Sequence, residues 1–373
     1  MNNFNEIDLD LLKRLSEADG ISGNEREVSR IVKNFGADFS DAIFYDNLGS
    51  VILQANGAPA APKIMLSSHL DEVGFMVRSI TEEGYLNLLP VGGWWGHVMP
   101  AQELTVTTET GGKFVGVVGS RAPHGMSKTE KTKVMEPREL YLDLGVPSRS
   151  FVEALGIQVG DMITPNVRFR QLNDPNYLLG KAWDDRCCVG VGLEVLRNLK
   201  RSSHQATVYF AATVQEEVGI RGARTAVYTI KPDIAIALDV TTATDTPLDC
   251  EGMNLGDGVT LSVLDSLTIG NSGLVQLMAE IVAELNLDVR YDFMTVGGTD
   301  ACNIHKMLTG VVSMTISIPT RYMHSPRLLI HRKDYEQTIQ LVTEFCRRVD
   351  WEQLNQLKST VGIQSKHEIE ETK

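Results

Sequence analysis

The feature that most constrains the fold is an alternation of apolar strands and helices that starts, stops and resumes along the chain. A helical region over residues 8–34 is interrupted by the sequence GISGNE and precedes short strands predicted at 42–47, 50–55 and 63–71. After about residue 178, helices predicted at 187–200, 273–286 and 334–349 alternate with apolar strands at 206–214, 233–240 and 310–318. This alternation predicts an α/β sheet with helices on both faces.

Between these two parts the pattern changes to short strands separated by glycine-rich turns. From about residue 74 to 171 the sequence is typical of a small antiparallel barrel or sheet. The strand that ends in His69 resembles the later α/β strands more than the segment that follows it. We therefore expect one discontinuous α/β domain, residues 1–73 and 172–373, interrupted by an all-β insert over 74–171 that serves in assembly or as a lid.

Composition excludes several classes of protein. Lys and Arg number 35 against 48 Asp and Glu, so the net charge is −13, and no basic stripe supports nucleic-acid binding. The N-terminus is acidic and amphipathic rather than a signal sequence, and no apolar run approaches the ~18 residues of a membrane span. Five cysteines without a CxxC pair predict reduced thiols and a cytoplasmic location.

Acidic and imidazole side chains follow several of the predicted strands. Open α/β sheets bind ligands at the carboxyl ends of their strands, so these side chains are expected to converge. They are His69 and Asp71, Glu216 and Glu217, Asp239, and His324, together with Asp184 and Asp185 just before a helix. Unpaired carboxylates gathered in this way would repel one another, which a divalent metal would prevent.

The types of ligand narrow the choice of metal. Histidine with carboxylates and no thiolate suits Zn²⁺, Co²⁺ or Mn²⁺, and five side chains fit two ions that share a carboxylate better than one ion. Each piece alone has a plainer interpretation. Asp184 and Asp185 could cap a helix, Glu216 and Glu217 could be solvated, and a single histidine at a strand end is usually structural. Together, the plainer interpretation needs several independent coincidences at one sheet edge.

Six ordered motifs carry a family resemblance. They are HLDEVGF at 69–75, GKAWDDR at 180–186, QEEVGIRGA at 215–223, ALDV at 237–240, GGTDA at 297–301 and RYMHSP at 321–326. The chain resembles the dinuclear-metal aminopeptidases of the tetrahedral type, the glutamyl-aminopeptidase family, some of whose members are labelled cellulase-like or endoglucanase-like. The resemblance implies a metallopeptidase domain with a mixed central sheet flanked by helices and an inserted barrel-like domain.

The same resemblance implies a role for each matching residue. Asp184 would bridge two metals, His69 and Asp239 would complete one ligand set, and Glu217 and His324 would complete the other. Glu216 would be the general base. Asp71, two residues after His69 on the same strand face, would orient that imidazole.

The expected activity is metal-dependent hydrolysis of N-terminal residues from short peptides with a free N-terminus, by water activated between two divalent ions. Zn²⁺ or Co²⁺ is expected, with Mn²⁺ as a further candidate. An endoglucanase-like glycoside hydrolase, an N-deacylase using the same site, and a non-catalytic assembly protein are the alternatives. By resemblance, we expect a homo-oligomer built from dimers, commonly of twelve subunits, with the insert at 74–171 making contacts.

Overall fold

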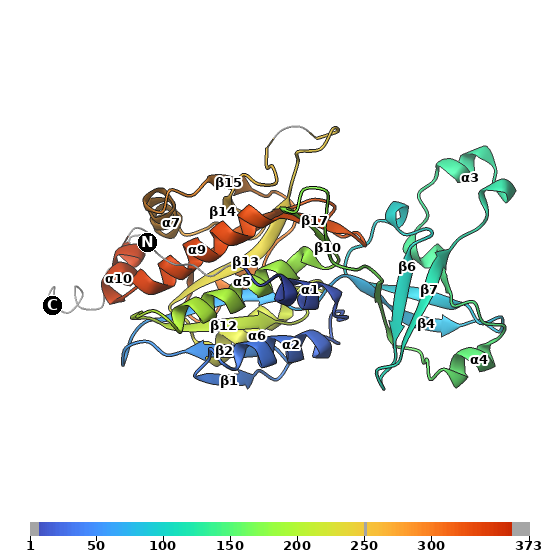
Figure 1. Ribbon diagram of the computed structural model, residues 1–373, viewed down its shortest axis with the longest axis horizontal. Coiled ribbons are helices and arrows are strands. Elements are labelled where there is room, and N and C mark those ends of the chain that lie inside the picture. The colour runs from blue at the N-terminus through green and yellow to red at the C-terminus, as the bar shows by residue number, and fades with distance from the viewer. Residues whose placement is uncertain (1–6, 250–251, 360–373) are drawn as a thin grey trace.

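The computed structural model describes residues 7–249 and 252–359, which form an α/β body with a barrel extending from one end (Figure 1). A sheet of eight strands crosses the α/β body in the order β1-β2-β12-β3-β13-β16-β14-β15. These strands are β1 (Ala42–Tyr45), β2 (Val51–Ala55), β3 (Lys63–His69), β12 (Thr207–Thr213), β13 (Ile234–Thr242), β14 (Val259–Leu264), β15 (Val289–Phe293) and β16 (Val312–Thr320).

The sheet is mixed, as the family resemblance implies. The four central strands, β12, β3, β13 and β16, are parallel, and β2 and β14 join them antiparallel on either side. Side chains of β3 alternate between two cores: Ile64 and Leu66 belong to one, and Met65 to the other. Because both faces are buried, the central strands have the continuous apolar sequence that marks them.

Helices cover both faces of this sheet. The larger core includes residues of α1 (Leu9–Glu17), α2 (Arg26–Gly36), α5 (Trp183–Leu199), α7 (Ser272–Glu284), α9 (Arg332–Arg348) and α10 (Trp351–Ser359). The smaller core on the other face includes residues of α6 (Arg221–Ile230) and α8 (Ala301–Ile304). The predicted break at GISGNE is present, since Gly23 has a φ of 88° that favours glycine.

The barrel closes in the order β4-β5-β8-β7-β6-β9. Its strands are β4 (Gly74–Ile80), β5 (Leu86–Val91), β6 (Glu103–Thr107), β7 (Lys113–Gly119), β8 (Tyr141–Asp143) and β9 (Met162–Pro165). Short helical segments in the insert are η1 (Gly96–Val98), η2 (Pro123–Gly125), α3 (Lys128–Thr132), η3 (Pro137–Glu139) and α4 (Arg149–Ala154). Phe75, Leu88 and Leu142 lie in a core of its own. The predicted antiparallel barrel is thus confirmed.

Polar contacts join the barrel to the α/β body beside the ends of the central strands. The Asp19 carboxylate accepts a hydrogen bond of 2.6 Å from the Thr164 hydroxyl of β9 and lies 2.7 Å from Lys113 Nζ of β7. A small separate sheet is formed by β10 (Arg170–Gln171) and β11 (Tyr177–Gly180), which follow the barrel in the sequence, and by β17 (Leu328–His331). In the described part of the chain, no helix has the length and apolar character needed to cross a membrane.

Candidate metal centre

Three parallel strands bring the predicted site residues to one level. Thr213 of β12 pairs with His69 of β3, so Glu216 and Glu217 follow just beyond His69. Ala237 of β13 pairs with Ser67 of β3, and two residues farther along each strand stand Asp239 and His69. The sequence suggested that Asp239 ends its strand, but the strand continues beyond it. β13 continues to Thr242 because it keeps pairing with β16 after β3 has ended.

Asp184 lies between the two predicted histidine ligands. Its Oδ1 is 3.1 Å from His69 Nε2, and its Oδ2 is 3.5 Å from His324 Nε2. The same His324 nitrogen lies 3.5 Å from Glu217 Oε2. Ligand atoms of His69, Asp184 and Glu217 all lie within 4.8 Å of one another. One carboxylate therefore faces two imidazoles with two different oxygens, which is the geometry a bridging ligand needs.

A second group of converging ligand atoms contains His69, Asp185 and Asp239, again within 4.8 Å. The structure thus brings together all five predicted ligands around His69 and Asp184. Asp185 is a residue that the sequence reasoning left without a role. Its Oδ2 accepts hydrogen bonds from the Ser68 hydroxyl at 2.6 Å and the His69 backbone N–H at 3.1 Å, and so holds the end of β3.

The turn that carries Glu216 and Glu217 is held by the Asp71 carboxylate. Asp71 Oδ1 accepts the N–H of Glu216 at 3.0 Å, and Oδ2 accepts the N–H of Glu217 at 3.1 Å. The Ser22 hydroxyl donates to the same carboxylate at 2.5 Å. Backbone geometry after the strand, with Gly219 at a φ of 124°, turns the chain as the sequence predicts.

Asp71 contacts the ring of His69 through its main chain and, at a longer distance, through its carboxylate. The Nδ1 of His69 is 2.9 Å from the main-chain oxygen of Asp71 and 3.6 Å from its carboxylate Oδ1. The main chain of Asp71 is thus the nearer partner of the ring, and the carboxylate is hydrogen-bonded to the Glu216–Glu217 turn. This leaves Nε2 of His69 directed toward Asp184, where a neutral imidazole can act as a ligand.

Burial and like charge raise the pKa values of several carboxyl groups. Burial and the nearby Asp184 carboxylate raise the pKa of Glu217 to about 8. Burial, with a contribution from Asp184, raises the pKa of Asp239 to about 8. Burial also raises the pKa of Glu216 well above its ordinary value. A buried group of carboxyls of this kind is relieved by a divalent cation, so the donor set fits a metal.

The pKa values of Asp184 and His324 shift in the direction opposite to that which burial alone would give. Although burial opposes the effect, hydrogen bonds from His324 and His69 lower the pKa of Asp184. The hydrogen bond to Asp184 raises the pKa of His324 to about 9, against the effect of desolvation. Asp184 is therefore the carboxylate that stays charged between the two rings.

The barrel supplies one side of the site. A Cβ built on Gly93, just after β5, would lie 2.9 Å from His324 Nδ1, and one on Gly92 would lie 3.4 Å from the Cβ of Glu217. The adjoining pocket is lined by residues of both parts, among them Val73, Pro165, Asp184, Glu217 and Leu328. Only the glycines of the turn signal GG at 92–93 pointed to a close approach there.

Comparison with known proteins agrees with this arrangement. The sequence matches the family described as M42 glutamyl aminopeptidase over residues 49–341, and a family described as AMPT over residues 6–31. It is 34% identical to the putative aminopeptidase FrvX of Escherichia coli (strain K12), over 94% of this chain and 98% of that protein. It is 34% identical to the lysyl aminopeptidase of Pyrococcus furiosus, over 90% of this chain and 95% of that protein.

Solved structures share the whole architecture. The TET aminopeptidase of a marine sediment Thaumarchaeota archaeon superposes with a TM-score of 0.90 at 38% identity, covering 94% of this chain and 98% of that one. PhTET1-12s, described as a dodecamer, has a TM-score of 0.80 at 28% identity, covering 91% and 99%. A Thermotoga maritima structure described as an endoglucanase has a TM-score of 0.76 at 28% identity, covering 93% and 99%.

The endoglucanase description belongs to solved structures of the same fold and does not favour the glycosidase alternative. The curated relatives that span nearly the whole chain are named aminopeptidases, and the family match extends over most of the residues that carry the site. The architecture, the donor set and these matches agree. The chain belongs to the M42 glutamyl aminopeptidase family.

Proposed function

We propose that this protein is a dinuclear metallo-aminopeptidase that removes N-terminal residues from short peptides. Asp184 would be shared by two divalent ions, His69 and Asp239 would complete one ligand set, and Glu217 and His324 the other. Zn²⁺ or Co²⁺ is the expected metal and Mn²⁺ a further candidate, because the donors are imidazoles and carboxylates without a thiolate among them.

The observation that carries the proposal is the position of Asp184 between two imidazoles. Its two oxygens face His69 and His324 separately, and Glu217 joins the His324 side. A structural ion pair would need only one histidine. A carboxylate with a separate ring at each oxygen, buried among further carboxylates, supports a pair of cation positions with one shared ligand.

Residues of the chain supply the remaining parts of the reaction. When bound, the two ions would acidify a water and polarise the peptide carbonyl. Glu216, held through its N–H by Asp71, takes the proton of the attacking water and passes it to the leaving amine. Burial raises the pKa of Glu216, which suits a group that must hold that proton near neutral pH. The pocket beside Asp184 and Glu217 leaves room next to the ions, where the free, unprotonated amino terminus of a peptide could serve as a ligand.

The division of labour within the chain is part of the same proposal. Residues 1–73 and 172–373 would form the catalytic domain, and residues 74–171 would form an insert that borders the site and takes part in assembly. The dodecamer described for PhTET1-12s supports a homo-oligomer, and assembly from dimers stays a prediction. A cytoplasmic location stays a prediction from the unpaired cysteines.

Metal removal tests the proposal directly. Exhaustive chelation should abolish hydrolysis of aminoacyl anilides, and adding Zn²⁺, Co²⁺ or Mn²⁺ should restore it as about two ions per chain are recovered. Metal content and rate are measured on the same samples. Full activity in protein shown to be free of metal would refute the dinuclear mechanism.

The choice of substrate separates the remaining alternatives. The same peptide is offered with a free and with an acetylated N-terminus, alongside carboxymethylcellulose. Only the free peptide should be cleaved, because a free amine could act as a ligand to a metal ion and an acetylated nitrogen could not. Hydrolysis of carboxymethylcellulose without action on aminoacyl anilides would establish the glycosidase, and release of acetate from the blocked peptide would establish the deacylase.

A further inference from the structure

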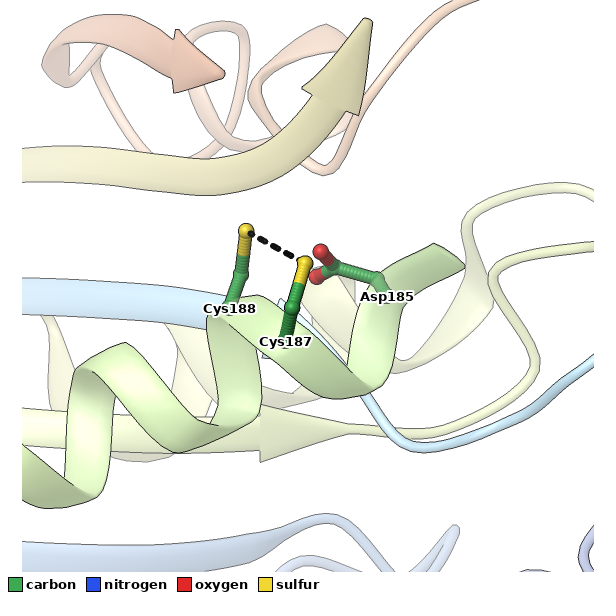
Figure 2. Close-up of side chains that lie close together, drawn as sticks. All are labelled: Asp185, Cys187 and Cys188. Atoms are coloured by element: carbon green, nitrogen blue, oxygen red, sulfur yellow. Dashed lines mark hydrogen bonds between the residues drawn. The ribbon is translucent and has the colours of Figure 1, made fainter. Parts of the chain in front are cut away.

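Two cysteines lie directly behind the candidate metal centre, next to a carboxylate. Asp185, Cys187 and Cys188 occupy the first turns of α5, and each is fully buried. Figure 2 shows the carboxylate of Asp185 beside the sulfur of Cys187, with the sulfur of Cys188 next to it. Neither thiol has a part in the mechanism proposed above.

The spacing of the three groups suits a single cation. The two sulfur atoms are 3.9 Å apart, and the three potential ligand atoms lie within 4.8 Å of one another. Two thiolates at ~2.3 Å from a tetrahedral ion would be separated by about 3.8 Å. The sulfurs are thus already at the separation that a shared ion requires.

Asp185 provides a second, independent sign of a missing partner. Its Oδ2 accepts from the Ser68 hydroxyl and the His69 N–H, whereas its buried Oδ1 has no hydrogen-bond donor among the described residues. A buried carboxylate oxygen without a partner is costly, and a cation would supply one.

The thiols themselves are satisfied when they carry their protons. Cys187 donates to the main-chain oxygen of Trp183 at 3.0 Å, and Cys188 donates to that of Asp239 at 3.1 Å. A hard ion such as Mg²⁺ would not displace these protons, but a cation with high affinity for sulfur would. The cluster is therefore selective for soft cations.

We propose that Asp185, Cys187 and Cys188 form a third cation site, separate from the two catalytic positions, that takes soft divalent ions such as Cd²⁺. The ion binds both sulfurs and the carboxylate, and the two thiol protons pass to solvent, so charge and atoms balance. The site adds to the proposed function without depending on it, since binding can be followed without any substrate.

Occupation of this site inhibits the enzyme through two shared residues. Asp185 holds the backbone N–H of His69, and Cys188 donates to the main chain of Asp239. Drawing the carboxylate and the thiols toward a common ion disturbs both contacts. We expect the rate to fall while the two catalytic ions remain bound.

The test begins with protein that holds two equivalents of Zn²⁺, to which Cd²⁺ is added. One further equivalent should be retained after gel filtration, with the ultraviolet absorption of cadmium–thiolate bonds and no release of zinc. Cys187→Ser and Cys188→Ser should each lose that absorption and the extra equivalent. Cys346→Ser, a buried thiol in α9, and Cys250→Ser, outside the described residues, should keep both.

Two results would overturn the site. One is cadmium uptake matched by zinc release without thiolate absorption, since the ion would then occupy only the catalytic positions. The other is equal loss of absorption in the Cys346→Ser or Cys250→Ser control. If the Cys187 and Cys188 variants fail to fold, cadmium NMR of the wild-type protein decides the matter. A spectrum with no sulfur-ligated resonance would refute the proposal.

Discussion

Glu216 and Glu217 are chemically identical neighbours that the backbone places in different surroundings. Their N–H groups donate to different oxygens of Asp71, and the chain turns directly after them at Gly219. Glu217 reaches His324 and takes part in a group of converging ligand atoms. Among the described residues, Glu216 belongs to no such group. Replacing each carboxylate should therefore change the enzyme's activity and metal content in a different way.

Glu216→Gln keeps the shape of the side chain and removes the proton acceptor. Metal content should stay near that of the wild type, KM should change little, and kcat should fall by roughly 10²- to 10⁴-fold. Glu217→Gln should lower the metal content and the rate together, because a ligand is weakened. Steady-state kinetics and metal analysis of both variants check this. Metal loss in Glu216→Gln with both ions kept in Glu217→Gln would reverse the two assignments.

Glu25 is a further positioning residue at this turn. Its Oε1 accepts the N–H of Gly23 at 2.7 Å and of Gln215 at 3.1 Å. Burial and the Asp71 carboxylate raise the pKa of Glu25 to about 7, so a neutral amide should replace it well. We expect Glu25→Gln to keep most of the activity and Glu25→Ala to lose kcat by about 10- to 100-fold.

The control for Glu25 is Glu27→Ala, two residues farther along the chain. The carboxylate of Glu27 pairs with Lys113 Nζ at 2.8 Å. That variant should keep the kcat of the wild type. Equal activity of Glu25→Gln and Glu25→Ala would show that the hydrogen bonds to Gly23 and Gln215 do not position the turn.

At the scale of elements, strand ends and one barrel loop together define the site. β3, β12 and β13 end or diverge at the same level, which brings their polar residues together. The loop after β5 then approaches His324 so closely that Gly93 has no room for a side chain. The barrel thus borders the candidate metal centre directly.

Gly93→Ala tests this close approach. A Cβ at Gly93 would meet Nδ1 of His324 at 2.9 Å, so the ring must shift away from Asp184 and Glu217. We expect a lower metal content and a lower kcat. Gly125→Ala is the matched control, because a Cβ there meets nothing within 4 Å. A Gly93→Ala protein that keeps its metal and its rate would exclude a positioning role for the loop.

At the scale of the whole molecule, the barrel is fixed to the α/β body and also exposes large apolar side chains. Asp19 joins β7 and β9 to the loop after α1 through Lys113 and Thr164. Trp95 is 60% exposed and Val159 is 67% exposed on the barrel side of the molecule. Exposed apolar residues of this size are typical of surfaces that contact other proteins.

The mass in solution tests the assembly. We expect light scattering at micromolar concentration to give a homo-oligomer of about twelve chains, by similarity to the dodecameric PhTET1-12s structure. Such an assembly would limit access to short or unfolded peptides. A strict monomer of 41.1 kDa under these conditions would contradict the prediction.

Much of the architecture could be predicted because it depends on local patterns. The continuous apolar runs around Ile64, Phe210 and Ile236 are what a strand buried on both faces requires. The helical spacing of apolar residues alone identifies α7 and α9. The strands β14 and β15 were missed. β15 is the edge strand of the sheet, and all its residues are exposed or half-buried, so it lacks the apolar run that marks a buried strand.

The sequence by itself determined which residues are candidates for the chemistry: polar groups after apolar strands, in motifs that resemble one family. Tertiary structure alone decided how they are used. The extension of β13 past Asp239 depends on its pairing with β16, and the second contact of Asp71 depends on where β12 turns. Likewise the approach of Gly93 to His324 joins a barrel loop to a segment more than two hundred residues away. Contacts between distant segments follow from packing in three dimensions, which no local pattern of residues records.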